Sequence, residues 1–264
     1  MPLSAPGHAM HPVGNLFRST IGRKFLMAVT GVVLIGFVIG HLVGNLQIFE
    51  NPDKINGYAT LLQSLGPTLW AARLFLLLCT VIHVWAATVL TIENHRARGG
   101  VERYKVKTWL QATVASRYMR WTGYVVLVFI LYHLAQFTWG VTSSATYKEN
   151  LPHYTMGSDY KVLGFTAVRA GTRVLDVHDM VILTFQTPAV SLFYIFAIGL
   201  LSLHLLHGAD SLFQTFGWRN HRWARGLRAV VTIGCAAYFL GNLAIPGAVM
   251  AGLLQPDSAA VAAK

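Results

Sequence analysis

The 264-residue sequence predicts an all-α integral membrane protein, a bundle of five transmembrane helices. Hydrophobic residues make up 54% of the chain and charged residues only 12%, whereas soluble domains carry about a quarter charged residues. The mean hydropathy is positive, at +0.50. Five apolar runs are each long enough to cross about 30 Å of hydrocarbon as a helix. They are Phe25–Phe49, Thr68–Glu93, Tyr118–Val141, Pro188–Phe213 and Leu227–Leu254.

Two tails flank the predicted membrane domain, which comprises residues 16–254. Residues 1–15 are rich in proline and glycine and are expected to be a mobile N-terminal tail, and residues 255–264 form a C-terminal tail. The first apolar run is too long for the core of a signal peptide and has no small-residue cleavage site at a suitable distance. We therefore expect it to remain as a helix. No internal repeat is apparent in the sequence.

The segment 142–186, between the third and fourth predicted helices, is longer than an ordinary connection, and we expect it to have structure of its own. Within it, Val174–Phe185 is predicted to be an apolar helix that lies at the membrane interface. His178 and Asp179 on this helix could contact a ligand near the outer surface. The simpler alternative is that both are solvated polar residues of a loop.

The distribution of charge predicts how the chain is oriented. The chain carries 21 Lys and Arg against 10 Asp and Glu, a formal net charge of +11. Such an excess would suggest nucleic acid for a soluble protein, but in a membrane protein it first indicates topology, and we expect no nucleic-acid partner. Fourteen of the 21 cations precede the first helix, separate the second from the third, or follow the fourth. The positive-inside rule then places the N-terminus in the cytoplasm and, with five helices, the C-terminus outside.

The first four predicted helices each contain a histidine, namely His41, His83, His133 and His204. An imidazole in hydrocarbon is unfavourable unless it has a partner. For any single histidine, a hydrogen bond to a neighbouring helix is as good an explanation as a ligand role. Four histidines on four helices favour the ligand role.

Depth in the membrane divides these histidines into two pairs. His41 and His133 each lie about 23 Å from the cytoplasmic start of their helix, at about 1.5 Å per residue. His83 and His204 each lie about 23 Å from the outer start of their helix, by the same rise. The first pair therefore shares a level in the outer half of the membrane, and the second pair shares a level in the inner half.

Two pairs of imidazoles at two levels fit two b-type haems stacked across the membrane. A planar macrocycle needs one neutral imidazole on each side of its iron and room between the helices. A mononuclear metal site would gather three or four ligands at one level, so iron is expected only as haem iron. The main alternative is a proton relay, but the helix interiors contain almost no carboxylates to share that role.

Small residues near the histidines would let a large ring approach the backbone. The alternative is close packing between helices through small-residue ridges, which is compatible with haem binding. These residues are Gly36, Gly40, Gly44, Ala86, Ala87 and Gly208.

Three further polar residues lie near the predicted ligands. His207 is three residues after His204, on nearly the same helix face, and is a secondary haem candidate. Depth favours His204, because His207 is closer to the inner interface. Asn45 and Gln136 follow His41 and His133 by four and three residues, so each could line a polar pocket beside the outer pair.

This pattern resembles the dihaem cytochrome b membrane subunit of the succinate dehydrogenase and fumarate reductase family. The likeness covers about Asn15 to Leu254 and is most specific in the histidine-bearing segments. It is carried by the five helices with histidines in the first four, by the H-L-x-x-N motif from His41 to Asn45, and by the H-x-x-x-G motif from His204 to Gly208, followed by Ser211, Phe213 and Gly217.

The resemblance implies a role for this chain as the membrane anchor of a succinate:quinone oxidoreductase in the bacterial inner membrane. Such a subunit binds a flavoprotein and an iron–sulfur subunit on the cytoplasmic face. It relays electrons to a membrane quinone, usually menaquinone, so this chain would contribute electron transfer and a quinone site but no flavin chemistry. The resemblance also implies His83 with His204 as ligands of the inner haem, and His41 with His133 as ligands of the outer haem.

Other features are left more open by the sequence. Asn45, Gln136 and Trp139 are candidates for the quinone site. Some fumarate reductases of this type have a glutamate two residues before the fourth-helix histidine, where this chain has Ser202, and we therefore favour the succinate-oxidising direction. The alternatives are a dihaem cytochrome b of another quinone-linked dehydrogenase or hydrogenase, a haem-free small transporter, or a structural anchor.

Neither cysteine alters this expectation. Cys79 and Cys235 both lie inside apolar runs, so the chain can build neither a disulfide framework nor a cysteine-ligated iron–sulfur cluster. The sequence also contains no dinucleotide fingerprint, phosphate loop or nucleophile triad. Substrate chemistry is therefore expected on partner subunits.

Overall fold

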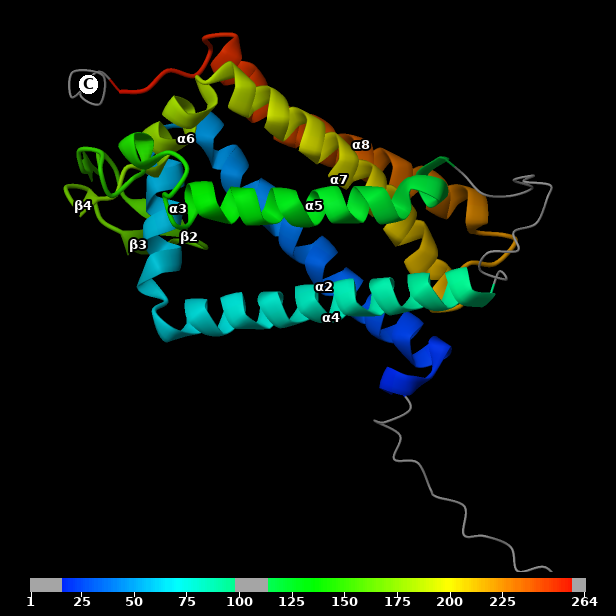
Figure 1. Ribbon diagram of the computed structural model, residues 1–264. Helices are drawn as coiled ribbons and strands as arrows, with labels where there is room; N and C mark the ends of the chain where they lie inside the picture. Colours follow the sequence, from blue (N-terminus) through cyan, green and yellow to red (C-terminus); the bar gives the residue numbers. More distant parts are fainter. Residues whose placement is uncertain (1–15, 98–113, 258–264) are drawn as a thin grey trace, which may run out of the picture.

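The computed structural model describes residues 16–97 and 114–257 and is 74% helical (Figure 1). The predicted N-terminal tail, most of the basic segment that follows the second apolar run, and the last seven residues lie outside the described part of the chain. The long helices coincide with the five apolar runs. They are α2 (Thr20–Asn45), α4 (Pro67–Ala97), α5 (Val114–Phe137), α7 (Pro188–Thr215) and α8 (Ala224–Met250).

Four of these helices are long and apolar enough to span a membrane, which supports a multi-pass membrane protein. They are the segments Thr20–Phe49, Pro67–Ala97, Pro188–Thr215 and Ala224–Met250. Helix α5 is not among the four, although it occupies the third predicted run. Many large apolar side chains on the four helices are exposed, among them Leu77 and Leu78 on α4 and Ile233 on α8, which suits a lipid environment.

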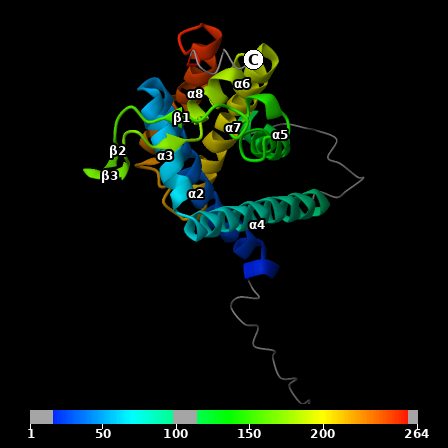
Figure 2. The same ribbon diagram turned by 90° about the vertical axis from the view of Figure 1, so that its left-hand side faces the viewer.

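Helix α7 lies at the centre of the bundle. It packs against α8, α5 and α2, whereas α4 packs against α2 at the edge (Figures 1 and 2). Local chemistry sets the helix starts: the Ser19 hydroxyl accepts a hydrogen bond from the backbone N–H of Gly22, and Pro188 occupies the first turn of α7. Pro246 lies inside α8 and is buried.

One end of the bundle is covered by a set of short elements that we call the cap. It contains η1 (Leu46–Phe49), α3 (Pro52–Ser64), η2 (Ser144–Thr146), β1 (Tyr154–Thr155), β2 (Tyr160–Val162), β3 (Phe165–Val168), β4 (Arg173–Val174) and α6 (Val177–Phe185). Strand β1 pairs with β4 and strand β2 pairs with β3, both antiparallel. The segment 142–186 therefore supplies most of the cap.

Asp53 fastens β1 and the following turn to α3. Its carboxylate accepts hydrogen bonds from the Tyr154 hydroxyl (3.0 Å), the Gly157 backbone (2.8 Å) and the Ser158 hydroxyl (2.7 Å). Burial alone would raise the pKa of Asp53, but these hydrogen bonds outweigh it and hold the pKa below its ordinary value. The same carboxylate raises the pKa of Tyr154, in addition to the effect of burial.

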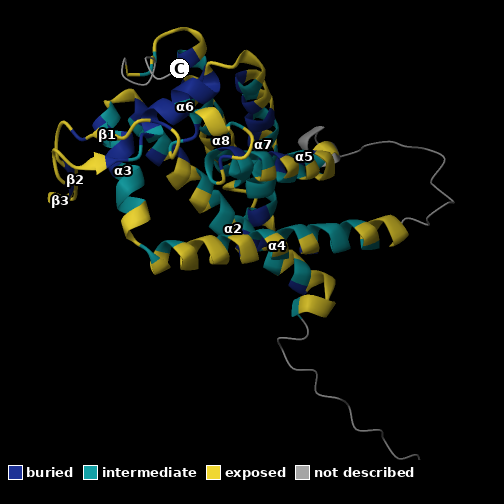
Figure 3. Ribbon diagram, turned by 60° about the vertical axis from the view of Figure 1, so that its left-hand side comes forward, coloured by how far each residue is buried: buried dark blue, intermediate teal, exposed yellow. Residues whose placement is uncertain are grey.

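Asn56 joins α3 to the start of α6. Its side-chain oxygen accepts hydrogen bonds from the backbone N–H groups of Val177 and His178, at 2.8 and 2.9 Å. Asp176 caps α6 by accepting from the backbone of Asp179, so the helix begins at Val177 rather than at Val174, which belongs to β4. Nearly every residue of α6 is buried (Figure 3). Its position at a membrane interface stays a prediction.

Candidate functional site

The structure brings His41 of α2 and His133 of α5 together. Their ring centroids are 5.7 Å apart and their planes are nearly perpendicular, at 89°. The depth calculation paired the same two residues from the sequence. Because an imidazole nitrogen binds a transition metal at about 2 Å, two rings that share one ion have centroids about 6 Å apart. The observed separation is close to that value and is also that of an ordinary edge-to-face contact between two rings.

Aromatic side chains contact both members of this pair, of which His41 is exposed and His133 is partly buried. Phe37 stacks on His41 at 5.5 Å, and the ring of His133 contacts Phe129 and Phe137 at 5.9 and 5.3 Å. Tyr194 of α7 lies 6.0 Å from His133 by ring centroids. An apolar, aromatic environment favours the neutral form of imidazole, which is the form that ligates metal.

Tyr194 also orients His133 through its hydroxyl group. The Tyr194 hydroxyl donates to Oε1 of Gln136 at 2.7 Å and lies 3.3 Å from Nδ1 of His133. Since its one proton is given to Gln136, the Tyr194 oxygen can only accept from His133, which places the imidazole proton on Nδ1. The lone pair on Nε2 of His133 is then free for a ligand.

His83 and His204, the predicted inner pair, are held in the same way by threonines. Thr30 of α2 donates its hydroxyl proton to the Leu26 carbonyl at 2.7 Å, and the same oxygen lies 3.2 Å from Nδ1 of His83 on α4. The oxygen therefore accepts from His83, and the proton is again on Nδ1. Nε2 of His83 carries the free lone pair.

The second threonine repeats this contact on the other side of the bundle. Thr122 of α5 donates to the Met119 carbonyl at 3.0 Å and lies 3.3 Å from Nδ1 of His204 on α7. Three of the four membrane histidines thus have Nδ1 bound to a hydroxyl oxygen.

The two threonines belong to an internal repeat, contrary to the expectation that the sequence contains none. Thr30-Gly31 precedes His41 by the same spacing with which Thr122-Gly123 precedes His133, eleven residues from threonine to histidine. Each glycine lies against the histidine of the neighbouring helix. An added Cβ on Gly31 would lie 3.5 Å from Cε1 of His83, and one on Gly123 would lie 3.3 Å from Cε1 of His204.

The glycines of α2 differ in what they face. A Cβ added at Gly36 or Gly40 would have no atom of the described chain within 4 Å, whereas one at Gly44 would overlap the ring of Tyr58. Close packing between helices therefore accounts for Gly44 but not for Gly36 and Gly40. Near the inner pair, Ala86 is fully buried and Gly208 faces only the end of a methionine side chain, at 3.8 Å.

The remaining predicted residues have different surroundings. His207 lies near Asp210, which pairs with Arg219 at 3.2 Å towards the end of α7. Gln136 is buried, and its amide also donates to the Ser143 hydroxyl at 3.3 Å, so both ends of that amide are bound within the protein.

The other two quinone candidates are less enclosed. Trp139 is exposed just beyond the end of α5. Asn45 ends α2, and no hydrogen bond of its side chain occurs in the part of the chain that the structure describes. No ring contact or hydrogen bond joins the Trp139 or Asn45 side chain to the His41–His133 pair within that part. The structure therefore connects only Gln136 to the pair, through Tyr194.

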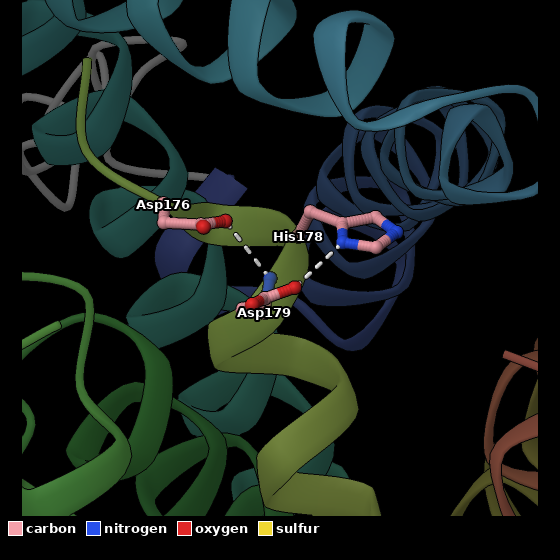
Figure 4. Close-up of side chains that lie close together, drawn as sticks. All are labelled: Asp176, His178 and Asp179. Atoms are coloured by element: carbon pink, nitrogen blue, oxygen red, sulfur yellow. Dashed lines mark hydrogen bonds and ion pairs between the residues drawn. The ribbon is translucent and has the colours of Figure 1, made fainter. Parts of the chain in front are cut away.

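A second group of polar residues lies in the cap, away from the helix interior. Asp176, His178 and Asp179 are buried with their ligand-type atoms within 4.8 Å of one another (Figure 4). Nδ1 of His178 contacts Asp179 at 2.9 Å, and both Asp179 oxygens accept from the backbone of Asp257. The group therefore ties α6 to the C-terminal segment. Burial raises the pKa of Asp176, although the hydrogen bond from the Asp179 backbone opposes this.

His41 and His133 come from two different helices, and the described residues that contact this pair include no carboxylate. Comparisons of the chain with protein-family models, with curated proteins and with solved structures find no match.

Proposed function

We propose that this chain is a membrane-embedded dihaem cytochrome b. His83 and His204 would hold one haem, and His41 and His133 the other. The observation that carries the proposal is the hydroxyl contact at Nδ1 of His83, His133 and His204. In each case the imidazole is fixed in the tautomer whose Nε2 can ligate iron.

When bound, such haems accept and return single electrons. The contribution of the protein is to hold the imidazoles, exclude water and set the reduction potentials. Aromatic rings around His133 exclude water from the outer level, and the hydroxyl groups of Thr30, Thr122 and Tyr194 increase the basicity of the imidazoles they contact. Gly36 and Gly40 leave the backbone of α2 open beside the outer pair.

The proposal includes α5 as a fifth membrane span. Helix α5 carries both His133 and Thr122 and packs along α7, which is itself long and apolar enough to span. Its two contacts to α7, through Thr122 near one end and His133 near the other, extend over eleven residues of helix. Eleven residues cover about 16 Å, about half of the hydrocarbon layer, and the 24 residues of α5 are long enough to cross the rest.

We further propose that the complex is a succinate:quinone oxidoreductase of the bacterial inner membrane. This step rests on the sequence resemblance in the histidine-bearing segments. A flavoprotein and an iron–sulfur subunit would dock at the cytoplasmic face, where the basic loops would lie, with the N-terminus inside and the C-terminus outside. Menaquinone is the proposed electron acceptor. Asn45 and Trp139, whose side chains are not held within the bundle, remain its candidate contacts. Gln136 could act through its second amide N–H or its remaining lone pair.

The alternatives make different predictions about cofactor and partners. A dihaem subunit of another quinone-linked dehydrogenase or hydrogenase would bind the same two haems but different soluble subunits. A haem-free transporter would keep the histidines without haem. No contact among the described residues favours the transporter. The hydroxyl contacts at Nδ1 leave Nε2 of each histidine free for a ligand, and they do not link the histidines into a continuous chain of proton carriers.

The deciding experiment is haem analysis of the purified chain. We expect two haems b per chain from the pyridine haemochrome, and a split α-band in the reduced-minus-oxidised spectrum. His83→Ala should remove one haem, whereas His153→Ala, in the exposed cap, should remove none. A chain without haem after expression with haem supplied would contradict the cytochrome proposal. Co-purification of a succinate-oxidising flavoprotein would then separate the proposed complex from the other quinone-linked complexes.

A further inference from the structure

The β2–β3 hairpin of the cap ends in an exposed apolar tip. Leu163 is 94% exposed and Phe165 is 79% exposed, and Val162 beside them is also exposed. The hairpin has a two-residue turn, Leu163-Gly164, between Val162 and Phe165, which are paired across the strands. Both turn residues have positive φ, +50° at Leu163 and +86° at Gly164.

Leucine is unfavourable at this turn for two separate reasons. A two-residue hairpin turn with positive φ at both positions favours asparagine, aspartate or glycine at the first position, and a left-handed conformation is unfavourable for other residues. A fully exposed leucine also leaves its apolar surface in water. Neither cost is offset by a contact within the described chain. A residue with both costs and no internal contact indicates a partner outside the chain.

The base of the hairpin, in contrast, is packed firmly. Tyr160 and Val168 are buried in a cluster with Met156 and Val174. The Tyr160 hydroxyl donates to Oε1 of Gln47 at 3.1 Å. The base is therefore rigid, and it presents the tip at a fixed place.

That place is the end of the first membrane span. Gln47 lies within the apolar segment Thr20–Phe49, two residues beyond the end of α2. Leu163 at the tip is three residues after Tyr160. At about 3.3 Å per residue of strand, the tip is therefore about 10 Å from Tyr160. In Figure 2, β2 and β3 project sideways past α3, away from α7 and α8. Its tip is thus at the level where the helices leave the hydrocarbon, and beside them.

Charge completes the pattern. Residues 157–174 carry three cations, Lys161, Arg169 and Arg173, and one acid, Asp159. The Asp159 carboxylate is used inside the hairpin, where it accepts from the backbone of Ala170 at 2.9 Å. Apolar side chains flanked by Lys and Arg, whose heads can reach the headgroups, are typical of segments that enter a membrane surface.

We propose that the β2–β3 hairpin is a bilayer wedge: Leu163 and Phe165 enter the interfacial region of the membrane beside the bundle, and the neighbouring cations contact anionic lipid headgroups. The wedge would fix the height and tilt of the cap relative to the membrane. This inference requires only that the chain spans a membrane, and it does not depend on haem binding.

The test places a nitroxide spin label at the tip of the full chain. Cys79 and Cys235 are replaced by alanine, Leu163→Cys is labelled, and the protein is reconstituted in vesicles of phosphatidylcholine and phosphatidylglycerol. Ala170→Cys, at the exposed turn between β3 and β4, is the matched control. We expect collisions with oxygen relative to a water-soluble nickel chelate to be several-fold more frequent at position 163 than at position 170.

Two results would overturn the proposal. One is equal access of the nickel chelate to both labels in vesicles. The other is broadening of the spectrum at position 163 that increases with the protein-to-lipid ratio, which would assign the tip to contact with a second copy of this chain. Leu163→Asn provides a separate measure. Asparagine tolerates positive φ, so melting in detergent should not fall, and a marked fall would assign Leu163 to the fold instead.

Discussion

Oγ1 of Thr30 lies 3.2 Å from Nδ1 of His83, and this contact between α2 and α4 fixes the tautomer of the histidine. The direction follows from the hydroxyl group, which has one proton and gives it to the Leu26 carbonyl of its own helix. A threonine that bonds its own backbone is common in membrane helices. Here the same bond converts the threonine oxygen into an acceptor for the neighbouring helix.

The Thr30 contact should influence the potential of the inner haem. An acceptor at Nδ1 makes the imidazole a stronger electron donor and favours oxidised iron. Thr30→Val removes the acceptor at similar size, so the midpoint potential of that haem should rise. A hydrogen bond of about 1 kcal/mol, of which only a part differs between oxidation states, corresponds to a few tens of millivolts.

Potentiometric titration of the two haems measures this effect. Thr30→Ser keeps the hydroxyl group and should restore the potential, which a purely steric role of Thr30 would not predict. The proposed outer haem, which His41 and His133 would hold, serves as the internal reference. Equal potentials in the valine variant and the unmodified chain, with both haems present, would remove Thr30 from this role while leaving the cytochrome proposal intact.

Tyr194→Phe should affect both the outer haem and stability. The variant removes the acceptor for His133, so the potential of the outer haem should rise while that of the inner haem stays constant. It also removes the hydroxyl group that donates to Oε1 of Gln136, a residue that is only 2% exposed. A buried acceptor without a partner costs about 1–3 kcal/mol, so melting in detergent should occur at a lower temperature.

Tyr132→Phe is the control for Tyr194→Phe. Tyr132 belongs to the same aromatic group, with its ring 6.1 Å from that of Tyr194, but no hydrogen bond of its hydroxyl to His133 occurs in the described chain. It should leave both potentials unchanged. Equal shifts in the two variants would show that the ring environment, and not the Tyr194 hydroxyl, sets the potential.

Several parts of this site could be predicted from the sequence, and the reasons are physical. Helix rise is regular, so the depth of His41 and His133 along apolar runs correctly indicated that they would meet. Thr30 and Thr122 were missed because a threonine in a helix usually bonds to its own backbone. The sequence therefore does not indicate that its side chain contacts another helix. The repeated spacing from Thr-Gly to histidine in α2 and α5 was available in the sequence and would have indicated both.

The cap was harder to predict. Its strands contain two to four residues each, too few to show the alternation that identifies a strand. The start of α6 was placed at Val174 because Val174 and Leu175 are apolar, like most of the residues that follow, whereas the structure begins the helix after Asp176, whose side chain caps it. Tyr194 was missed because a tyrosine in an apolar run looks like any other lipid-facing or core aromatic residue.

Acid should weaken the cap through Asp53. Its pKa is lowered in the folded chain, because its hydrogen bonds outweigh the effect of burial. A carboxyl group with a lowered folded pKa stabilises the fold above its unfolded pKa, about 4, and this stabilisation is lost as pH falls through the folded value. Asp53→Asn should therefore be less stable at pH 7 and should lose less on acidification. Thermal melting in detergent from pH 7 to pH 2.5 tests this.

Asp159→Asn is the comparison for Asp53→Asn, because Asp159 is an exposed acid of the same cap that accepts from one backbone group. It should retain the acid sensitivity of the unmodified chain. If Asp53→Asn melts with the same pH dependence as the unmodified chain, the hydrogen bonds from Tyr154, Gly157 and Ser158 do not control the acid response of the cap.

Filling the open space beside α2 should exclude the outer haem. A Cβ added at Gly40 would meet no atom of the described chain within 4 Å, and we expect Gly40→Phe to fold and insert normally. If that space belongs to the haem held by His41 and His133, the phenyl ring occupies it, and haem content should fall from two to one per chain. Gly234→Phe is the matched control, because Gly234 on α8 is equally open but lies on a helix without a haem ligand. Loss of haem in both variants would indicate a general effect of bulk on insertion, and retention of both haems in Gly40→Phe would assign the open face to lipid.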